Sequence, residues 1–188
     1  MSMLKKIDEI LKQERIIGYL DPHAEEFILE LNGEKFGTSS SCLGRITIIE
    51  GKWPWERDKS RVVYKSHEKI SIYNIANVIS RPFNDLWLKV TGPIIHIRTE
   101  RIDCALNILN IARISGFKHS GIISSSDNVF TVELMSAVQI TMPLKINDTF
   151  VFSKESLNEI INKANDALDE GHRRLRKLTN MVKEDLIC

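Results

Sequence analysis

The order of helix-like and strand-like patterns along the chain is the feature that most limits its fold. Helical spacing of apolar residues marks five segments, at residues 4–11, 21–33, 71–80, 101–116 and 153–182. Strand-like runs lie between them, at residues 44–51, 61–67, 86–100 and 121–143. Because the two patterns do not alternate one for one, the sequence predicts an α+β fold with mixed sheets packed against helices, and not a Rossmann fold.

Local signals define the ends of several elements. Asp21 and Pro22 suit the start of a helix, and Asn32-Gly33 suits its end. Ser126-Asp127-Asn128 predicts a turn between two strands. The last segment predicts a long C-terminal helix, mostly acidic in its first half and basic in its last turns, which complements the helix dipole. The chain has no linker-like stretch, so we expect a single domain over residues 1–188.

Charge and hydropathy narrow the class of protein. The chain has 26 basic and 25 acidic residues, a net charge of +1, so a nucleic-acid surface would have to come from local clustering of charge. No apolar run approaches the roughly 20 residues that span a membrane, and the N-terminal stretch lacks the apolar region of a signal peptide. These features predict a cytoplasmic protein without a membrane partner.

Cysteine and histidine spacing gives no metal or disulfide signal. The three cysteines contain no CxxC pair, which argues against a disulfide framework and for a reducing compartment. The five histidines show no HxH or HxxxH spacing, so we expect no metal site. The GxGxxG and GxxxxGK[ST] signatures of nucleotide sites are also absent.

The stretch "GTSSSCLGRITII" at residues 37–49 combines hydroxyl side chains with Gly44 and Arg45. It fits a nest of backbone N–H groups that binds an anion, with Arg45 adding a bidentate fork. It fits equally a turn whose hydroxyls satisfy local backbone groups.

Two segments are locally basic. Between Lys52 and Lys69, six Lys/Arg face three Asp/Glu, and the same segment carries Trp53 and Trp55. Basic residues interleaved with tryptophan suit RNA, because cations contact phosphates and rings stack on bases. The alternative is a solvated loop with one tryptophan in the core. The second segment, "HRRLRKL" at residues 172–178, is either a phosphate-contacting face or a basic helix end that complements the dipole.

Several motifs in a fixed order resemble the tRNA wybutosine-synthesising protein 3 family. They are "GYLD" at 18–21, "TSSSCLGRI" at 38–46, "SH" at 66–67, "PIIHI" at 93–97, "ISGFKHSGI" at 114–122, "MPL" at 142–144 and the helix "ESLNEIINKANDALDEGHRRLRKL" at 155–178. The resemblance covers nearly the whole chain. It implies an S-adenosylmethionine-dependent methyltransferase that does not use a Rossmann fold. Its substrate would be N4 of 4-demethylwyosine, the tricyclic base 3′ of the anticodon of tRNA(Phe), in wybutosine biosynthesis.

The resemblance suggests roles for particular residues. His67 and His96 are the candidates for the general base. The residues expected to line the donor or substrate site are Thr38, Ser40, Ser41, Gly44, Arg45, Ser115, Gly116, Ser120 and Gly121. Local charge and ring stacking, and not the family motifs, give the residues expected to contact the anticodon stem-loop: Lys52, Trp53, Trp55, Arg57, Lys59, Arg61, Arg173, Arg174, Arg176 and Lys177. Cys42 is expected to pack or line the site, since methylation of nitrogen needs no nucleophilic thiol.

The chain departs from the family pattern at Glu100 and Met135, where members carry a basic residue, although Arg98 and Arg101 lie near the first. The acceptor stays open among the wyosine intermediates. Two other readings stay open. One is a non-catalytic tRNA-binding module of the same fold. The other is a phosphate-ester hydrolase using the Ser/Cys stretch, which lacks a metal signature or a triad.

Overall fold

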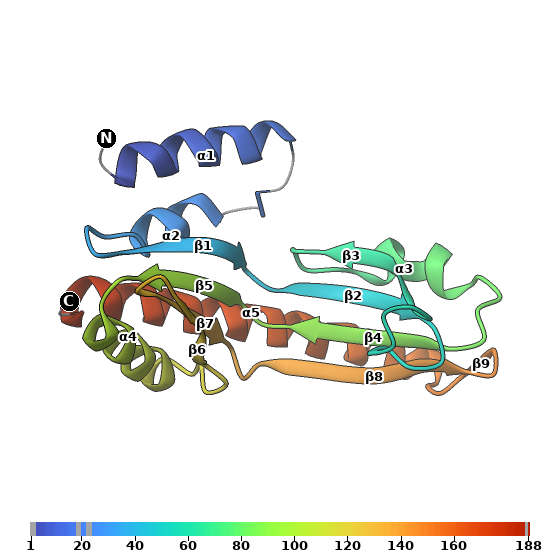
Figure 1. Cartoon of the computed structure of the whole chain (residues 1–188). Coiled ribbons are helices and arrows are strands. Elements are labelled where there is room, and N and C mark those ends of the chain that lie inside the picture. Colours follow the sequence, from blue (N-terminus) through green and yellow to red (C-terminus); the bar gives the residue numbers. More distant parts are fainter. Residues whose placement is uncertain (1–2, 18–19, 22–23, 187) are drawn as a thin grey trace. The chain divides into compact units, whose positions relative to one another are not determined.

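The computed structural model describes residues 3–17, 20–21, 24–186 and 188, and divides the chain into two compact units (Figure 1). The first unit contains residues 1–43, 93–137 and 171–188, and the second contains residues 44–92 and 138–170. The predicted features at Gly18, Tyr19 and Pro22 lie outside the described residues. That the two units fold as a single domain stays a prediction.

The first unit is built on a four-stranded sheet with the strand order β1-β5-β7-β6. Its elements are α1 (Met3–Ile17), α2 (Ala24–Glu30), β1 (Phe36–Cys42), β5 (Ile94–Thr99), α4 (Ile102–Ile114), β6 (Gly121–Ser126) and β7 (Val129–Met135). Alternate residues of the central strands, such as Ile95, Ile97, Val132 and Leu134, join one buried cluster with residues of the helices. One face of this sheet is therefore covered by helices.

The second unit is built on a five-stranded sheet with the strand order β3-β2-β4-β8-β9. Its elements are β2 (Arg45–Glu50), β3 (Arg61–Ser66), α3 (Ile72–Ile79), β4 (Leu86–Thr91), β8 (Gln139–Ile146) and β9 (Thr149–Phe150). Ile46, Ile48, Leu88 and Val90 of the central strands are almost fully buried, in a cluster that includes Ile75 of α3.

The long helix α5 (Lys154–Asp185) contributes to both cores. Leu157, Ile161, Ala164 and Leu168 join the cluster of the second unit, whereas Leu175, Leu178 and Val182 join that of the first. The predicted α+β fold with a long C-terminal helix is confirmed. Strand pairing among the described residues is antiparallel throughout. In the described ranges, no helix combines the length and apolar character needed to cross a bilayer.

Two hairpins close on residues that tolerate left-handed backbone. Asp127 and Asn128 have φ of 51° and 60°, and Asn147 and Asp148 have φ of 49° and 57°. Positive φ at both central residues matches the twist of paired strands, and Asn and Asp accept it more readily than other non-glycine residues. The sequence predicted the first turn, but not the second turn or the short strand β9.

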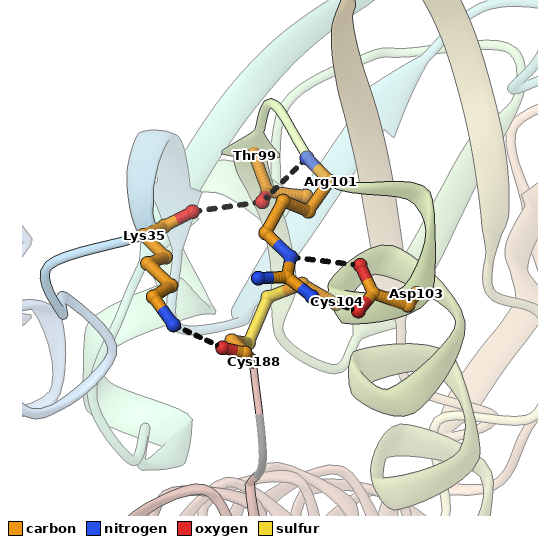
Figure 2. Close-up of a disulfide and its surroundings, with 6 residues drawn as sticks. All are labelled: Lys35, Thr99, Arg101, Asp103, Cys104 and Cys188. Atoms are coloured by element: carbon orange, nitrogen blue, oxygen red, sulfur yellow. Dashed lines mark hydrogen bonds and ion pairs between the residues drawn. A yellow bond between two sulfur atoms is a disulfide. The ribbon is translucent and has the colours of Figure 1, made fainter.

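A disulfide joins Cys104, in the first turn of α4, to Cys188, with Cα atoms 4.6 Å apart (Figure 2). Lys35 Nζ donates to the carbonyl oxygen of Cys188, and Thr99 Oγ1 donates to the carbonyl oxygen of Lys35 at 2.7 Å. The expectation that the cysteines are unpaired was wrong for these two, because partners 84 residues apart leave no local spacing signal.

The disulfide should stabilise the protein by restricting the unfolded chain, which the bond closes into a long loop. We expect Cys188→Ser to lower the free energy of unfolding by about 4 kcal/mol, measured by urea denaturation without reductant. Reductant should shift the wild-type transition and leave that of Cys188→Ser unchanged. Equal transitions for the two proteins without reductant would contradict a stabilising cross-link.

The start of α4 carries an exposed ion pair. Arg101 Nε donates to Asp103 Oδ1 at 3.0 Å, and this hydrogen bond lowers the pKa of Asp103 from 3.8 to about 2. Because the folded-state pKa is depressed, the contribution of the pair to stability is present above the ordinary carboxyl pKa and is lost as pH falls through about 2. We expect Arg101→Gln to return the pKa of Asp103 toward its ordinary value in a carboxyl-carbon NMR titration. An unchanged pKa would show that Arg101 is not its cause.

Candidate active site

The hydroxyl-rich stretch is a strand and not a loop. It forms β1, an edge strand paired antiparallel with β5, and its register shifts between Thr38 and Ser40. Because strand side chains alternate between faces, the stretch divides in two. Thr38 and Ser41 pair with Ile97 and Ile95 on the helix-covered face, whereas Ser40 pairs with His96 on the opposite face.

On the helix-covered face, Thr38 is fixed by an asparagine. Asn32 Nδ2 donates to Thr38 Oγ1 at 2.9 Å, and the backbone N–H of Thr38 donates to Asn32 Oδ1 at 2.8 Å. These two bonds tie the end of α2 to β1. The hydroxyl of Ser41 is buried, and within the described ranges it has no hydrogen-bond partner. Thr38 therefore has a structural role, whereas Ser41 retains unused hydrogen-bonding capacity.

The opposite face carries a row of polar residues across all four strands. Ser40 pairs with His96, His96 pairs with Glu133, and Glu133 pairs with Gly121. Directly opposed residues of antiparallel strands lie close enough for their side chains to interact. Arg98 points to the same face as His96, two residues along β5, and is exposed. We call the surface formed by Ser40, His96, Arg98, Gly121 and Glu133 the polar face.

His96 and Glu133 form the central contact of the polar face. His96 Nε2 lies 2.8 Å from Glu133 Oε2, and the two side chains are 29% and 31% exposed. Since the carboxylate accepts, Nε2 carries the proton of this hydrogen bond. The other ring nitrogen, Nδ1, accepts no hydrogen bond from any described residue, so a neutral His96 presents its basic nitrogen there.

The second small-residue segment divides into packed and open positions. Ser115 is buried and donates to Met181 Sδ, and Ser120 Oγ donates to the carbonyl oxygen of Phe117. A Cβ on Gly116 would lie 2.8 Å from Arg174 Cδ, and its φ is +95°. A Cβ on Gly121 would meet nothing within 4 Å. Only Gly121 leaves open space, and it does so beside Glu133.

Gly44, Arg45 and His67 belong to the second unit. Gly44 has φ of +104°, and a Cβ there would lie 2.8 Å from the carbonyl oxygen of Thr91, so the position requires glycine. His67 Nδ1 donates to the carbonyl oxygen of Gly44 at 2.9 Å, which leaves Nε2 as the basic nitrogen of the neutral ring. Arg45 begins β2 and is exposed.

Two basic residues near the end of α5 make hydrogen bonds within the first unit. Arg174 Nη1 donates to the carbonyl oxygen of Gly116 at 3.3 Å, and Lys177 Nζ donates to that of Ile114 at 3.0 Å. Both carbonyls lie at the C-terminal end of α4, where helices leave acceptors without intrahelical donors. These contacts favour the structural alternative for Arg174 and Lys177. Arg173 and Arg176 are exposed, and their contact with RNA stays a prediction.

The basic, tryptophan-containing segment begins with the connection between β2 and β3. Trp53 and Trp55 stack on each other with ring centroids 4.8 Å apart, and both are exposed. Lys52, Arg57 and Lys59 are exposed as well. Arg61, at the start of β3, is paired with Glu50 at 3.0 Å.

Sequence reasoning missed Glu133. Glu133 lies 37 residues from His96, and only the pairing of β5 with β7 brings the two together. The alternation of polar and apolar residues in "VFTVELM" indicates that Glu133 faces away from the core, but no local signal shows its partner.

Comparison with known proteins identifies the family. The family model described as "Methyltransferase TYW3" matches residues 1–184. The chain belongs to the TYW3 methyltransferase family. It is therefore an enzyme of the methyltransferase class, and the predicted resemblance is confirmed.

Two related proteins show how much of the chain is shared. An Aeropyrum pernix protein is 43% identical over 184 residues, which is 97% of this chain and 98% of the relative. A Saccharolobus solfataricus protein is 36% identical over 169 residues, which is 88% of this chain and 81% of the relative. Both are named tRNA(Phe) 7-((3-amino-3-carboxypropyl)-4-demethylwyosine(37)-N(4))-methyltransferase.

Solved structures share the fold. A crystal structure of an Aeropyrum pernix protein superposes with a TM-score of 0.82 at 40% identity, covering 87% of this chain and 98% of that one. A Pyrococcus horikoshii protein superposes with a TM-score of 0.84 at 25% identity, covering 97% of this chain and 98% of that one. The arrangement of helices and strands is thus shared with these two solved structures.

The two glycines of the second small-residue segment should respond differently to substitution. Gly116→Ala should lower the free energy of unfolding by about 1–3 kcal/mol, because alanine is strained at its positive φ and the neighbouring Arg174 must move. Gly121→Ala should change it by less than about 0.5 kcal/mol, since the added methyl group meets open space. Urea denaturation measures both, and equal losses would contradict the open position at Gly121.

Proposed function

We propose that this methyltransferase transfers a methyl group from S-adenosylmethionine to N4 of a 4-demethylwyosine-type base of tRNA(Phe), in the cytoplasm. The relatives' names give 7-(3-amino-3-carboxypropyl)-4-demethylwyosine at position 37 as their substrate, and we propose the same acceptor here. The single observation that carries the proposal for this chain is the His96–Glu133 pair beside the open position at Gly121.

The reaction sets the requirements of the site. A bond forms between the acceptor nitrogen and the methyl carbon, the bond from that carbon to sulfur breaks, and the nitrogen loses a proton. When bound, S-adenosylmethionine supplies an activated methyl group on a positively charged sulfur. The protein must then align the acceptor and accept its proton, which are the two contributions that side chains make to such a displacement.

His96 is the better candidate for the base. Glu133 holds Nε2, so Nδ1 is the nitrogen available to take the proton of the acceptor. The carboxylate also stabilises the imidazolium that proton transfer produces, as a second group does in other oriented histidine bases. His67 remains the alternative through Nε2, because its Nδ1 is held by the carbonyl oxygen of Gly44.

The polar face fits part of the donor. The amino-acid end of S-adenosylmethionine carries an ammonium and a carboxylate group, which need hydrogen-bond acceptors and donors respectively. Ser40 offers an exposed hydroxyl and Gly121 open space for close approach. We propose that these two contact the donor. Ser41 faces the helix-covered side of the sheet, so its contact with the donor stays a prediction. Four other predicted site residues make contacts within the first unit: Thr38, Ser115, Gly116 and Ser120. For Gly44 and Arg45, contact with the donor stays a prediction.

The partner proposed here is the anticodon stem-loop of tRNA(Phe), which presents the acceptor base. Arg173 and Arg176 of α5 are exposed cations in the first unit and are proposed to contact phosphates. Arg174 and Lys177 contribute by holding the end of α4.

The test uses purified protein, methyl-labelled S-adenosylmethionine and tRNA(Phe) from cells arrested before the N4 methylation step. We expect label in the tricyclic base, and a decrease in kcat of about 100-fold or more for His96→Ala, with recovery at high pH where the acceptor loses its proton to solvent. Glu133→Gln should lower kcat less than His96→Ala, because the amide can still accept from Nε2 but does not stabilise the imidazolium.

Two controls make this test specific. Glu159→Gln makes the same chemical change on the exposed side of α5 and should leave kcat unchanged. Calorimetric titration of each variant with S-adenosylmethionine separates loss of donor binding from loss of the base. Full activity of His96→Ala would refute its role as base and leave His67. tRNA binding without transfer would favour a non-catalytic binding module.

A further inference from the structure

The connection between β2 and β3 exposes two tryptophan rings, although a solvated loop needs no aromatic residue. Trp55 is 65% exposed and Trp53 is 39% exposed. Trp53 lies against two rings: its centroid is 4.8 Å from that of Trp55, with 18° between the planes, and 5.8 Å from that of Trp87. Trp55 contacts one ring only, so it is the outermost member of a three-tryptophan cluster. These exposed fractions are too high for core residues, since a tryptophan stabilises a core only where its ring is buried.

The backbone holds this cluster in place. Trp87, on β4, donates through Nε1 to the carbonyl oxygen of Gly51 at 3.0 Å. Gly51 has φ of +143°, and a Cβ there would lie 2.8 Å from the carbonyl oxygen of Lys59, so the two ends of the connection approach closely. The turns within it are closed by the N–H groups of Glu56 and Lys59, which donate to the carbonyl oxygens of Trp53 and Glu56. The exposed rings are therefore pre-organised, which lowers the entropy lost when a ligand binds.

The charges around the cluster favour an anionic partner. Lys52, Arg57 and Lys59 are exposed, against Glu56 and Asp58, which gives three cations and two anions in the connection. None of these cations is in an ion pair with another described residue. Unneutralised lysine and arginine beside a flat aromatic ring is the combination with which proteins bind single-stranded nucleic acid. A second copy of this chain would bring the same positive charges together, which disfavours self-association.

We propose that Trp55 is a stacking platform for an unpaired base of the RNA substrate, with Lys52, Arg57 and Lys59 contacting the adjoining phosphates. We call Trp55, Trp53 and Trp87 the tryptophan platform. Trp53 stacks on the Trp55 ring, and Trp87 contacts Trp53. The inference rests on the proposed function, because it takes the RNA to be the substrate of the methyl transfer.

The platform makes a prediction about binding to RNA that requires no methyl donor. The probe is a fluorescently labelled, unmodified RNA hairpin with the anticodon stem-loop sequence of tRNA(Phe), and its affinity is measured by fluorescence anisotropy. We expect Trp55→Ala to weaken binding about 5- to 150-fold, which corresponds to the loss of one stacked base. Trp55→Phe should retain part of the affinity. Tyr73→Ala removes an aromatic residue that is 89% exposed on α3 of the same unit, and it should have no effect.

Salt dependence separates stacking from charge. Trp55→Ala should shift the plot of log affinity against log salt without changing its slope, whereas Lys52→Ala should reduce the slope by roughly 0.7, the value for one phosphate of a single strand. A base-paired RNA of the same length should bind Trp55→Ala and wild type equally, because it offers no unpaired base. Wild-type affinity of Trp55→Ala for the hairpin would overturn the platform, as would equal losses for hairpin and duplex.

Three further outcomes test the inference and keep it apart from the proposed function. If the wild type sediments as a dimer and Trp55→Ala sediments as a monomer, the platform joins copies of this chain. That result would overturn the inference. Hairpin binding that depends on Trp55, in a protein that transfers no methyl group, would support the platform and refute the proposed reaction. Methyl transfer with wild-type hairpin affinity in Trp55→Ala would refute the platform alone.

Discussion

The antiparallel pairing of β5 with β1 and β7 is the constraint on which the candidate site depends. It sends Ile95, Ile97 and Thr99 into the helix-covered core, and the same alternation sends His96 and Arg98 to the opposite face. A slip of one residue in either pairing would reverse both sets and bury charged groups. The buried apolar residues therefore fix the register that brings Glu133 to His96. Core packing and the chemistry of the polar face are set by one hydrogen-bonded ladder.

Several small residues show how the same motif serves folding and function together. Gly44 and Gly116 occupy positive-φ positions where a Cβ would approach another group closely, and Thr38 is bound by Asn32. These residues are needed to form the units whether or not they touch a ligand. Ser40 and Gly121 have no such structural requirement in the described contacts, which makes them the members of the motif whose substitution best separates binding from stability.

The local patterns allowed most of the elements to be predicted. Helices α1 to α5, the strands from β2 to β8 and the turn at Asp127-Asn128 follow from apolar spacing and turn chemistry. Strand β1 was not predicted, because a run of serines has low strand propensity and is held extended only by β5. The two-residue strand β9 and the disulfide were missed for the same reason, since each depends on a partner elsewhere in the chain.

The sequence by itself determined the fold class, the long helix and, through its ordered motifs, the family and the methyltransferase class. It also named His96, Ser40 and Gly121 as candidates. Only the tertiary structure showed that Thr38 and Ser41 face away from Ser40, that Glu133 holds His96, and that Arg174 and Lys177 bind the end of α4. The physical reason is that periodicity shows which face of an element is apolar, whereas strand register and helix packing decide which polar groups meet across elements.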